Sequence, residues 1–461
     1  MTTIAIVGAG FSGTLLCLHL LRHCPPSTRL VLIERHSQFG RGLAYSTGNP
    51  SHILNVPAAR MSAFHDRPGD FVAWLSTQPE AASLGPDSFA PRRLFGAYIR
   101  ALLNEELKRS GRDRLELVRG NVVGIDRGNP RLALQLERGD PIPAEIAVLA
   151  VGNFPPEPSA VPNRAFYDTP FYSGDPWSPA ALDGLPPDAP VLLLGTGLTA
   201  VDVAISLLDR KHTGPIHAIS RRGLLPRRHA SVPAHTPEHA PFPTSVNDLA
   251  RFLRREAARA AAQGSSWQPI IDELRPFTVD IWQTMPLRDR ARFLRHLRPW
   301  WEVHRHRMAP EVADRIEAAR AAGQFHLLIG RVRDYAEQDG RVTVFYRPRG
   351  KEQPEQLEVA RVINCAGPSA DYDRMPDPLV RTLLTDGTAR PDPLRLGLDV
   401  TTNCALLHRD GSISRRIFAV GPVTKGAFWE MTAVPDIRRQ TEKLAEHLAA
   451  LVKARPVARV L

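Results

Sequence analysis

The stretch IAIVGAGFSG, residues 4–13, decides how the first part of this chain folds. Its first four residues are an apolar, β-branched run, which predicts a buried parallel strand. Three glycines follow in the pattern G-x-G-x-x-G: Gly8, Gly10 and Gly13. Apolar residues then recur at helical spacing, and the next apolar strand, RLVLIE at residues 29–34, ends in Glu34. Strand, loop, helix, strand and acid therefore occur in the order of a dinucleotide-binding unit.

Each part of this pattern has a physical role in holding a dinucleotide. The first glycine permits a tight turn, the second lets the backbone approach a pyrophosphate, and the third lets the helix pack closely on the strand. The helix N-terminus attracts the negative charge, and the acid binds ribose hydroxyls. The alternative is a glycine-rich turn that binds nothing. The predicted cofactor-binding residues of this unit are Gly8, Gly10, Phe11, Ser12, Gly13, Glu34 and Arg35.

A second stretch, VLLLGTGLTA at residues 191–200, repeats the design, with Ala200 in the third glycine position. Its following strand, PIHAIS at residues 215–220, ends in a hydroxyl and two arginines instead of an acid. Guanidinium groups pair with phosphate, so these residues favour the 2′-phosphate of NADPH over NADH. The alternative is that the arginines form a solvated turn. The predicted residues of this unit are Gly195, Thr196, Gly197, Leu198, Thr199, Ser220, Arg221 and Arg222.

Two such loops in one chain suit two nucleotides, one held permanently and one exchanged. We expect FAD in the N-terminal unit and NADPH in the second. The fold class is therefore predicted as α/β, with two Rossmann-like dinucleotide-binding domains. The expected ranges are 1–160 and 355–461 for a split FAD-binding domain, 185–350 for the NAD(P)-binding domain, and 247–322 for a helical insertion in the latter.

The insertion leaves two interpretations open. In the first, it is an amphipathic helix pair, starting at an Asn247 N-cap, that packs on the sheet. In the second, it is a lid or substrate wall whose arginines suit acidic substrates. The residues that would then face the flavin cleft are Trp300, Trp301, His304 and Arg307.

Composition excludes several other classes of protein. The 461 residues carry a net charge of +11, but only six of the 59 basic residues are lysine, and they form no block, so nucleic-acid binding is not expected. No apolar run reaches a membrane span, and no signal peptide is predicted. His235 and His239 are four residues apart, but without a further ligand motif no metal site is expected.

The four cysteines show no Cys-x-x-Cys spacing, which argues against zinc and against a redox disulfide. Cys365 ends an apolar strand, so we interpret it as buried packing and not as a nucleophile. This cysteine usage predicts a reducing, cytoplasmic location.

Several further segments carry a resemblance to a known family. They are HILNVPAARMSAF (52–64), EIAVLAVGNFPPEP (145–158), RVINCAGP (361–368) and IFAVGPVTKGAFWEMTAVPDIRRQ (417–440). The chain resembles the two-dinucleotide-binding-domain flavoproteins, in particular a bacterial FAD/NAD(P)-binding family related to flavin-dependent, N-hydroxylating monooxygenases. In 145–158, Leu149, Ala150, Gly152 and Pro158 match the N-hydroxylase pattern. The resemblance implies further flavin-site residues: Asn55, which is also the catalytic candidate, Val56, Val122, Gly152, Gly421, Trp429 and Thr432.

One segment departs from related monooxygenases. Enzymes that oxygenate ketones or soft sulfur carry an F-x-G-x-x-x-H fingerprint, whereas FYDTPFYSGDPW at residues 166–177 has Thr169 and Ser173 at the glycine and histidine positions. The departure disfavours those reactions and leaves N-hydroxylation open.

The resemblance implies a monooxygenase that uses FAD, NADPH and molecular oxygen. It would hydroxylate an amine or amino-acid nitrogen through a flavin C4a-hydroperoxide. Two alternatives remain: an FAD-dependent NAD(P)H reductase or dehydrogenase acting on a small-molecule or protein acceptor, and a non-catalytic flavin redox sensor. The identity of the substrate and the oligomeric state stay open.

Overall fold

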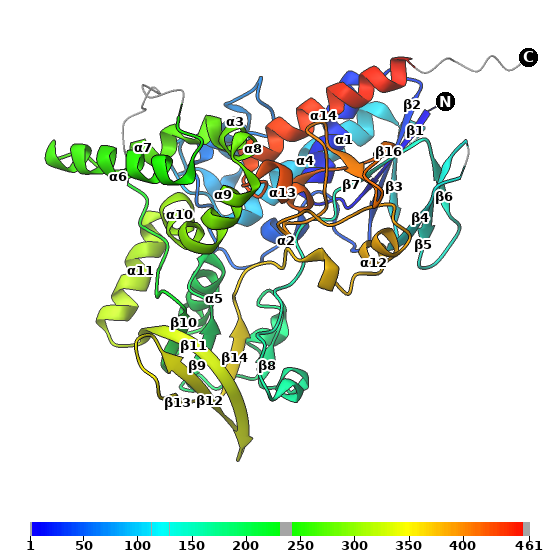
Figure 1. The fold of residues 1–461 in the computed structure, drawn as a ribbon. Helices are drawn as coiled ribbons and strands as arrows, with labels where there is room; N and C mark the ends of the chain where they lie inside the picture. The colour runs from blue at the N-terminus through cyan, green and yellow to red at the C-terminus, as the bar shows by residue number, and fades with distance from the viewer. Residues whose placement is uncertain (1, 112, 129, 231–241, 455–461) are drawn as a thin grey trace, which may run out of the picture. The chain divides into compact units, whose positions relative to one another are not determined.

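The computed structural model describes residues 2–111, 113–128, 130–230 and 242–454. His235 and His239 therefore lie outside the described residues. The chain divides into two compact units. The first consists of residues 1–48, 56–153 and 370–461, and the second of residues 49–55 and 154–369. In Figure 1 the first unit runs mainly through blue, cyan and orange to red, and the second through green to yellow.

The first unit is built on a six-stranded sheet in the order β15-β16-β7-β1-β2-β3. All neighbours in it are parallel except β15 and β16. Strands β4 (Val122–Asp126), β5 (Leu132–Leu136) and β6 (Ile142–Ala144) form a small antiparallel sheet. The six strands are β1 (Thr2–Val7), β2 (Thr28–Glu34), β3 (Leu115–Arg119), β7 (Ile146–Leu149), β15 (Ala405–Leu407) and β16 (Ile413–Ala419).

Helices accompany this sheet. Helix α1 contacts both α4 and the C-terminal helix α14. The first eleven residues of α1 are all buried, because it packs against the strands and both helices. The helices are α1 (Phe11–His23), α2 (Gly42–Tyr45), α3 (Asp70–Ser76), α4 (Arg92–Ser110), α12 (Pro378–Thr385), α13 (Lys425–Phe428) and α14 (Val434–Ala454), with short 3₁₀ turns η1 (Ala58–Arg60), η2 (Pro79–Ala81), η7 (Tyr372–Arg374) and η8 (Gly421–Thr424).

The second unit has a seven-stranded sheet in the order β13-β12-β11-β10-β9-β14-β8. Strands β8, β14, β9, β10 and β11 run parallel, and β11, β12 and β13 form an antiparallel meander. The strands are β8 (Tyr172–Ser173), β9 (Val191–Leu194), β10 (Ile216–Ser220), β11 (Phe325–Gln338), β12 (Arg341–Pro348), β13 (Glu355–Val359) and β14 (Arg361–Asn364).

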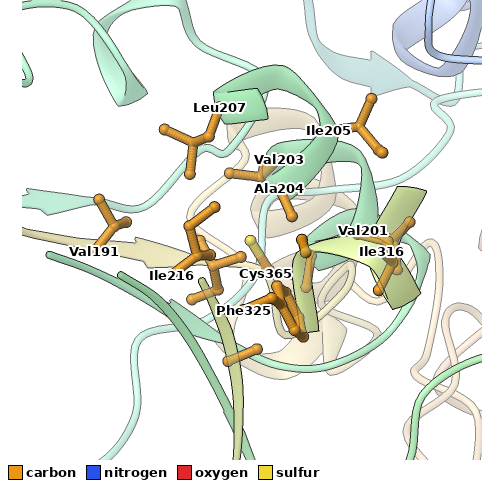
Figure 2. Close-up of a cluster of buried hydrophobic side chains, with 14 of the residues drawn as sticks. Val191, Val201, Val203, Ala204, Ile205, Leu207, Ile216, Ile316, Phe325 and Cys365 are labelled. Atoms are coloured by element: carbon orange, nitrogen blue, oxygen red, sulfur yellow. The ribbon is translucent and has the colours of Figure 1, made fainter. Parts of the chain in front are cut away.

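Both faces of this sheet are buried, which explains the continuous apolar run of β9. Val191 and Leu193 point into one cluster with α5 and α11, shown in Figure 2 together with Cys365. Leu192 and Leu194 belong to the opposite cluster, which includes residues of β11, β12 and 3₁₀ turn η3 (Arg164–Asp168). The alternation of strand side chains divides one run between two cores.

Within the described residues, the insertion is a series of helices, α6 to α11, and not a helix pair. Helix α6 begins at Val246 after an N-cap at Ser245, so the prediction of Asn247 as N-cap was wrong. Helix α11 contacts α5 and β11. The helices of this unit are α5 (Leu198–Asp209), α6 (Val246–Ala262), α7 (Gln268–Glu273), α8 (Thr278–Thr284), α9 (Leu287–Arg292), α10 (Arg298–Arg305) and α11 (Pro310–Ala321), with a π-helical turn η6 (Phe293–Leu297) and 3₁₀ turns η4 (Pro179–Ala181) and η5 (Arg275–Phe277).

The second unit extends to residue 369, and its strand β14 pairs with β9. The sequence had instead predicted that the C-terminal part of the FAD-binding domain begins at residue 355. In the described ranges, no helix combines the length and apolar character that crossing a membrane requires.

Candidate functional site

The first glycine loop joins β1 to α1 and has no room for side chains at two positions. Gly8 has a φ of +103°, and an added Cβ would collide with the backbone oxygen of Ala150. At Gly13 an added Cβ would collide with the backbone oxygen of Gly8. The loop thus lies directly against the end of β7, and only glycine fits these two positions.

The N-terminus of α1 has no side-chain cap among the described residues. Gly10 is the N-cap, with extended φ and ψ of −70° and −166°, and no side chain caps the helix. The first N–H groups of a helix need acceptors, and the helix dipole favours a negative one. This backbone fits the pyrophosphate of a dinucleotide.

Glu34 lies at the end of β2 and bonds to the glycine loop itself. Its Oε2 accepts a hydrogen bond from the Ala9 backbone N–H at 2.8 Å, and its Oε1 accepts one from the His36 N–H at 3.0 Å. These bonds orient the carboxylate, whose remaining lone pairs can accept from ribose hydroxyls. Arg35, also predicted as a cofactor residue, instead pairs with Asp377 at 3.3 Å.

The segment after β16 meets the start of α1. Gly421 has a φ of +80°, and an added Cβ would collide with the Ser12 hydroxyl. The Gly421 N–H donates to Gln440 Oε1 at 2.8 Å, which ties the turn to α14. The structure therefore brings together Gly8, Gly10, Phe11, Ser12, Gly13, Glu34 and Gly421.

Backbone strain follows in the same segment. Trp429 is buried, with a φ of +48° and a ψ of −179°, and Glu430 has a φ of +24°. Such conformations are costly for residues other than glycine and concentrate at functional sites. The Trp429 ring faces the Lys425 ammonium at 5.0 Å. Thr432 was expected near the start of the last helix, but α14 begins two residues later at Val434.

The other predicted flavin residues differ in their surroundings. Gly152 follows β7 with a φ of +74°, and its Cβ position is open. The Val122 side chain is buried, so only its backbone is available to a ligand. Val56 belongs to the first unit. Asn55 belongs to the second unit, so its predicted place beside the flavin stays a prediction.

The short segment 49–55 that contains Asn55 is anchored on α5. His52 Nε2 lies 3.0 Å from the Asp202 backbone oxygen and 2.9 Å from Ser206 Oγ. The Asn49 side-chain amide donates to Asp209 at 2.9 Å. These contacts explain why the segment clusters with the second unit although the sequence around it belongs to the first.

The second glycine loop, between β9 and α5, repeats the geometry of the first. Gly195 has a φ of +118°, and an added Cβ would lie 2.5 Å from the Cys365 backbone oxygen. The N-cap of α5 is Gly197, with φ and ψ of −82° and −171°, and no side chain caps the helix. Apart from its two neighbours in the chain, no described residue has a heavy atom within 4 Å of the Gly197 Cβ position. Leu198 and Thr199 form the first turn of α5.

The turn after β10 is held by hydroxyl groups. Ser220 Oγ accepts from the Gly223 N–H at 3.0 Å and lies 3.0 Å from Thr196 Oγ1, so it joins the turn to the second glycine loop. The two arginines of the turn differ. Arg221 is exposed, whereas the Arg222 guanidinium lies 5.9 Å from the Trp300 ring. The Ser220 hydroxyl retains its capacity to donate to a phosphate.

Sequence reasoning missed four basic residues that the structure gathers beside Arg221. They lie on or just after the β11–β12 hairpin: Arg331, Arg347, Arg349 and Lys351. The segments GRVR and YRPRGK held a signal, since both place arginines near the carboxyl end of a predicted sheet. The sequence did not reveal that β11 and β12 pair with each other, and this pairing is what brings the arginines together.

The insertion residues divide between surface and core. The Arg307 side chain is buried, donates to Gln268 Oε1 at 2.6 Å and pairs with Asp272, so it does not form the exposed wall of the flavin cleft that the second interpretation expected. His304 packs edge-on against Trp267 at 4.7 Å. Trp300 is 43% exposed, and its ring lies 5.9 Å from the Arg222 guanidinium in the turn after β10.

Thiol and metal chemistry find no support among the described residues. All four cysteines, Cys17, Cys24, Cys365 and Cys404, are buried and unpaired. Burial raises the pKa of the Cys365 thiol, which disfavours a nucleophilic thiolate. No group of three or more histidine, cysteine or acidic side chains in the described ranges is placed to hold a metal ion.

A family model and two curated relatives match parts of this chain. Residues 5–154 match the model of a FAD-NAD(P)-binding family. The chain is 25% identical over 246 residues to an L-aspartate N-monooxygenase (nitrosuccinate-forming) of Streptomyces davaonensis, covering 43% of this chain and 38% of that protein. It is 25% identical over 289 residues to the corresponding protein of Streptomyces cremeus, covering 52% of this chain and 43% of that protein. The chain thus spans less than half the length of these relatives.

Solved structures match over almost the whole chain. The ornithine hydroxylase of Pseudomonas aeruginosa, in its reduced form, superposes with a TM-score of 0.68 at 14% identity, covering 98% of this chain and 100% of that one. An ornithine N-hydroxylase of Kutzneria gives 0.68 at 16% identity, covering 98% and 99%. Thioredoxin reductase of Lactococcus lactis gives 0.55 at 13% identity, covering 99% and 100%. These solved structures confirm the predicted fold of two dinucleotide-binding domains. The resemblance to FAD/NAD(P)-binding flavoproteins related to N-hydroxylating monooxygenases is carried by the family model and the two Streptomyces relatives.

Proposed function

We propose that this chain, which has the two-dinucleotide-binding-domain flavoprotein fold, is an FAD- and NADPH-dependent monooxygenase that hydroxylates the nitrogen of an amino acid or amine. One observation carries the assignment of the two cofactors. The two units each hold a glycine loop of the same backbone geometry, and the one acid that ends a following strand, Glu34, lies in the first. FAD is assigned to the first unit and NADPH to the second.

In the first unit, the residues fit FAD through its pyrophosphate and ribose. The uncapped N-terminus of α1 would hold the pyrophosphate through its backbone N–H groups. Glu34 is held by the loop and would accept from the ribose. When bound, FAD supplies the transfer of electrons from NADPH and the activation of oxygen. The protein contributes position and an environment shielded from water.

In the second unit, α5 and the turn after β10 fit NADPH. The open Gly197 position leaves space for the pyrophosphate at the N-terminus of α5. Arg221 is exposed at the end of β10, where a 2′-phosphate is bound in NADP-dependent Rossmann units.

The substrate class rests on the relatives and neighbours. Those named above act on aspartate and ornithine, and further neighbours are an L-lysine 6-monooxygenase and a cadaverine monooxygenase. We propose L-aspartate as the first substrate to test, with ornithine, lysine and cadaverine beside it. The four separated, buried cysteines fit a reducing compartment, and we place the protein in the cytoplasm.

A disulfide reductase is the competing function suggested by neighbours such as thioredoxin reductase. That chemistry needs a pair of neighbouring cysteines exposed to a partner. In this chain all four cysteines are buried and none forms a pair. The cysteines therefore favour the monooxygenase.

The test is the oxidation of NADPH by the FAD-loaded protein in air. We expect at least one of the four candidate substrates to increase the rate and to form a hydroxylamine in proportion to the NADPH consumed. The Gly10→Asp variant, which introduces a negative charge where the pyrophosphate binds, is the matched control. NADPH oxidation that proceeds equally with and without every substrate, and yields only hydrogen peroxide, would contradict the proposal.

A further inference from the structure

A hollow at the carboxyl edge of the second unit's sheet is lined almost entirely by cationic side chains. They are Arg221, Arg331, Arg347, Arg349 and Lys351. Strand β10 ends at Ser220, which is paired with Ile329, so the next residues of β11 continue past the end of β10. Among the described residues that line the hollow, none is acidic. The hollow therefore concentrates positive charge beside the turn that carries Arg221.

This concentration is unfavourable unless an anion is present. Arg331 and Arg347 lie directly opposite each other in the antiparallel β11–β12 ladder. Like charges in that position destabilise a sheet. Lys351 pairs with Glu355, but over the described ranges Arg331, Arg347 and Arg349 form no ion pair. An anionic ligand would offset the repulsion, as would be expected for a phosphate site.

The backbone holds the hairpin firmly against the turn after β10. Gly223 has a φ of +59°, and its Cβ position lies 2.5 Å from Ile329 Cγ1. An added Cβ at Gly330 would lie 2.6 Å from the Arg347 backbone oxygen. The Arg349 N–H donates to the Ile329 backbone oxygen at 2.8 Å. The arginines of the hairpin and Arg221 are thus carried by backbone that is fixed before a ligand binds, which reduces the entropic cost of binding.

We propose that Arg331, Arg347 and Arg349 of the β11–β12 hairpin, together with Arg221, bind the 2′-phosphate of NADPH and set the preference for NADPH over NADH. Arg222 does not line this hollow, and its guanidinium lies 5.9 Å from the Trp300 ring. This inference rests on the proposed function only for the assignment of NADPH to the second unit. It moves the main specificity determinant from the end of β10 to the adjacent hairpin.

The test is isothermal titration of the full chain with NADP⁺ and NAD⁺, which differ only by the 2′-phosphate. We expect wild type to prefer NADP⁺, and Arg347→Gln/Arg349→Gln to lose about tenfold or more in affinity for NADP⁺, since charge-assisted hydrogen bonds are of that strength. Affinity for NAD⁺ should stay unchanged, which also shows that the variant is folded. Arg341→Gln is the matched control, because Arg341 lies at the far end of the same hairpin and pairs with Glu358.

Three results would overturn the inference. They are equal wild-type affinity for NADP⁺ and NAD⁺, an unchanged NADP⁺ preference in the double variant, and an equal loss in the Arg341→Gln control. A second measurement needs only wild type: its NADP⁺ preference should fall as salt is raised, because salt screens partly exposed charges. A preference that does not depend on salt would also contradict the inference. These titrations need no turnover. A failed monooxygenase assay would therefore leave the NADP⁺ titrations unaffected, whereas a wrong phosphate site would change the titrations alone.

Discussion

At the scale of single residues, the two glycine loops depend on contacts that sequence alone identifies only in part. The pattern predicted that Gly8 and Gly195 make tight turns, and each has a positive φ against a backbone oxygen. The sequence also indicated Glu34 as the acid that binds the ribose hydroxyls. It did not reveal that Arg35 pairs with Asp377, because that contact joins residues 342 positions apart. Long-range ion pairs depend on the completed fold.

The first prediction separates the structural from the ligand-binding glycines. Gly8→Ala should lower the free energy of unfolding by about 2 kcal/mol or more, because the side chain meets the Ala150 backbone oxygen and the φ is positive. Gly10→Asp should leave the stability of the FAD-free protein nearly unchanged, since its Cβ position meets only Gly42 at 3.5 Å. It should nevertheless abolish FAD retention. Urea denaturation and the flavin absorbance of purified protein measure both, and a Gly10→Asp protein that purifies with full flavin refutes the assignment.

The second prediction concerns the strain at Trp429. Trp429→Gly should be more stable than Trp429→Ala by about 1 kcal/mol, because both lose the same packing but only glycine adopts this φ and ψ without strain. At positions with negative φ, the alanine variant is instead the more stable of the two. Thermal denaturation of the two variants checks the prediction, and an alanine variant as stable as the glycine variant would show that the backbone is not strained there.

At the scale of elements, apolar patterns predicted the strands and helices but not their partners. The run at residues 361–364 was expected in the FAD-binding domain, yet β14 pairs with β9 in the second sheet. An apolar strand followed by glycine has the same appearance in either sheet, so only tertiary pairing decides. The β11–β12 hairpin was missed for the same reason, although its arginines were visible in the sequence.

The third prediction belongs to helix α1, where His19 is 1% exposed and packs edge-on against Phe64. Burial, with a smaller contribution from the charge of Arg22, lowers the pKa of His19 from 6.5 to about 4. Between these values the unfolded chain binds a proton that the folded chain does not, so stability falls as the pH decreases from 6.5 toward 4. At pH 5 the loss from this residue should be about 2 kcal/mol.

The measurement compares wild type with His19→Phe, which keeps an aromatic ring at this site but does not titrate. Urea denaturation at pH 7.5 and pH 5 should show about 2 kcal/mol less pH dependence in the variant. The same pH dependence in both proteins would mean that His19 is protonated in the folded state at pH 5.

At the scale of the whole molecule, the chain holds two discontinuous units. The chain passes from the first unit to the second for the short segment 49–55 and then returns to the first unit at residue 56. It passes to the second unit again after residue 153 and returns to the first at residue 370. The two glycine loops allowed the sequence to predict two nucleotide-binding regions and a split first one. It could not assign segment 49–55, because the contacts of His52 and Asn49 with α5 depend on tertiary structure.

The fourth prediction is that the two nucleotides can be lost separately. Gly197→Asp should purify with FAD but lose NADP⁺ binding, because its Cβ position is open and the new carboxylate occupies the expected pyrophosphate position. Gly10→Asp should show the opposite pattern, losing FAD while keeping NADP⁺ binding. Flavin absorbance and titration with NADP⁺ measure the two losses. Loss of both nucleotides in both variants would contradict the assignment of one nucleotide to each unit.

The central claim is that the protein transfers an oxygen atom to nitrogen. The most direct measurement is mass spectrometry of the product formed by the FAD-loaded protein from NADPH, L-aspartate or one of the candidate amines, and isotope-labelled dioxygen. We expect a product hydroxylated on nitrogen that carries one labelled oxygen atom. If NADPH is consumed and all the label appears in hydrogen peroxide with every candidate, the protein is a reductase or oxidase and the account is wrong.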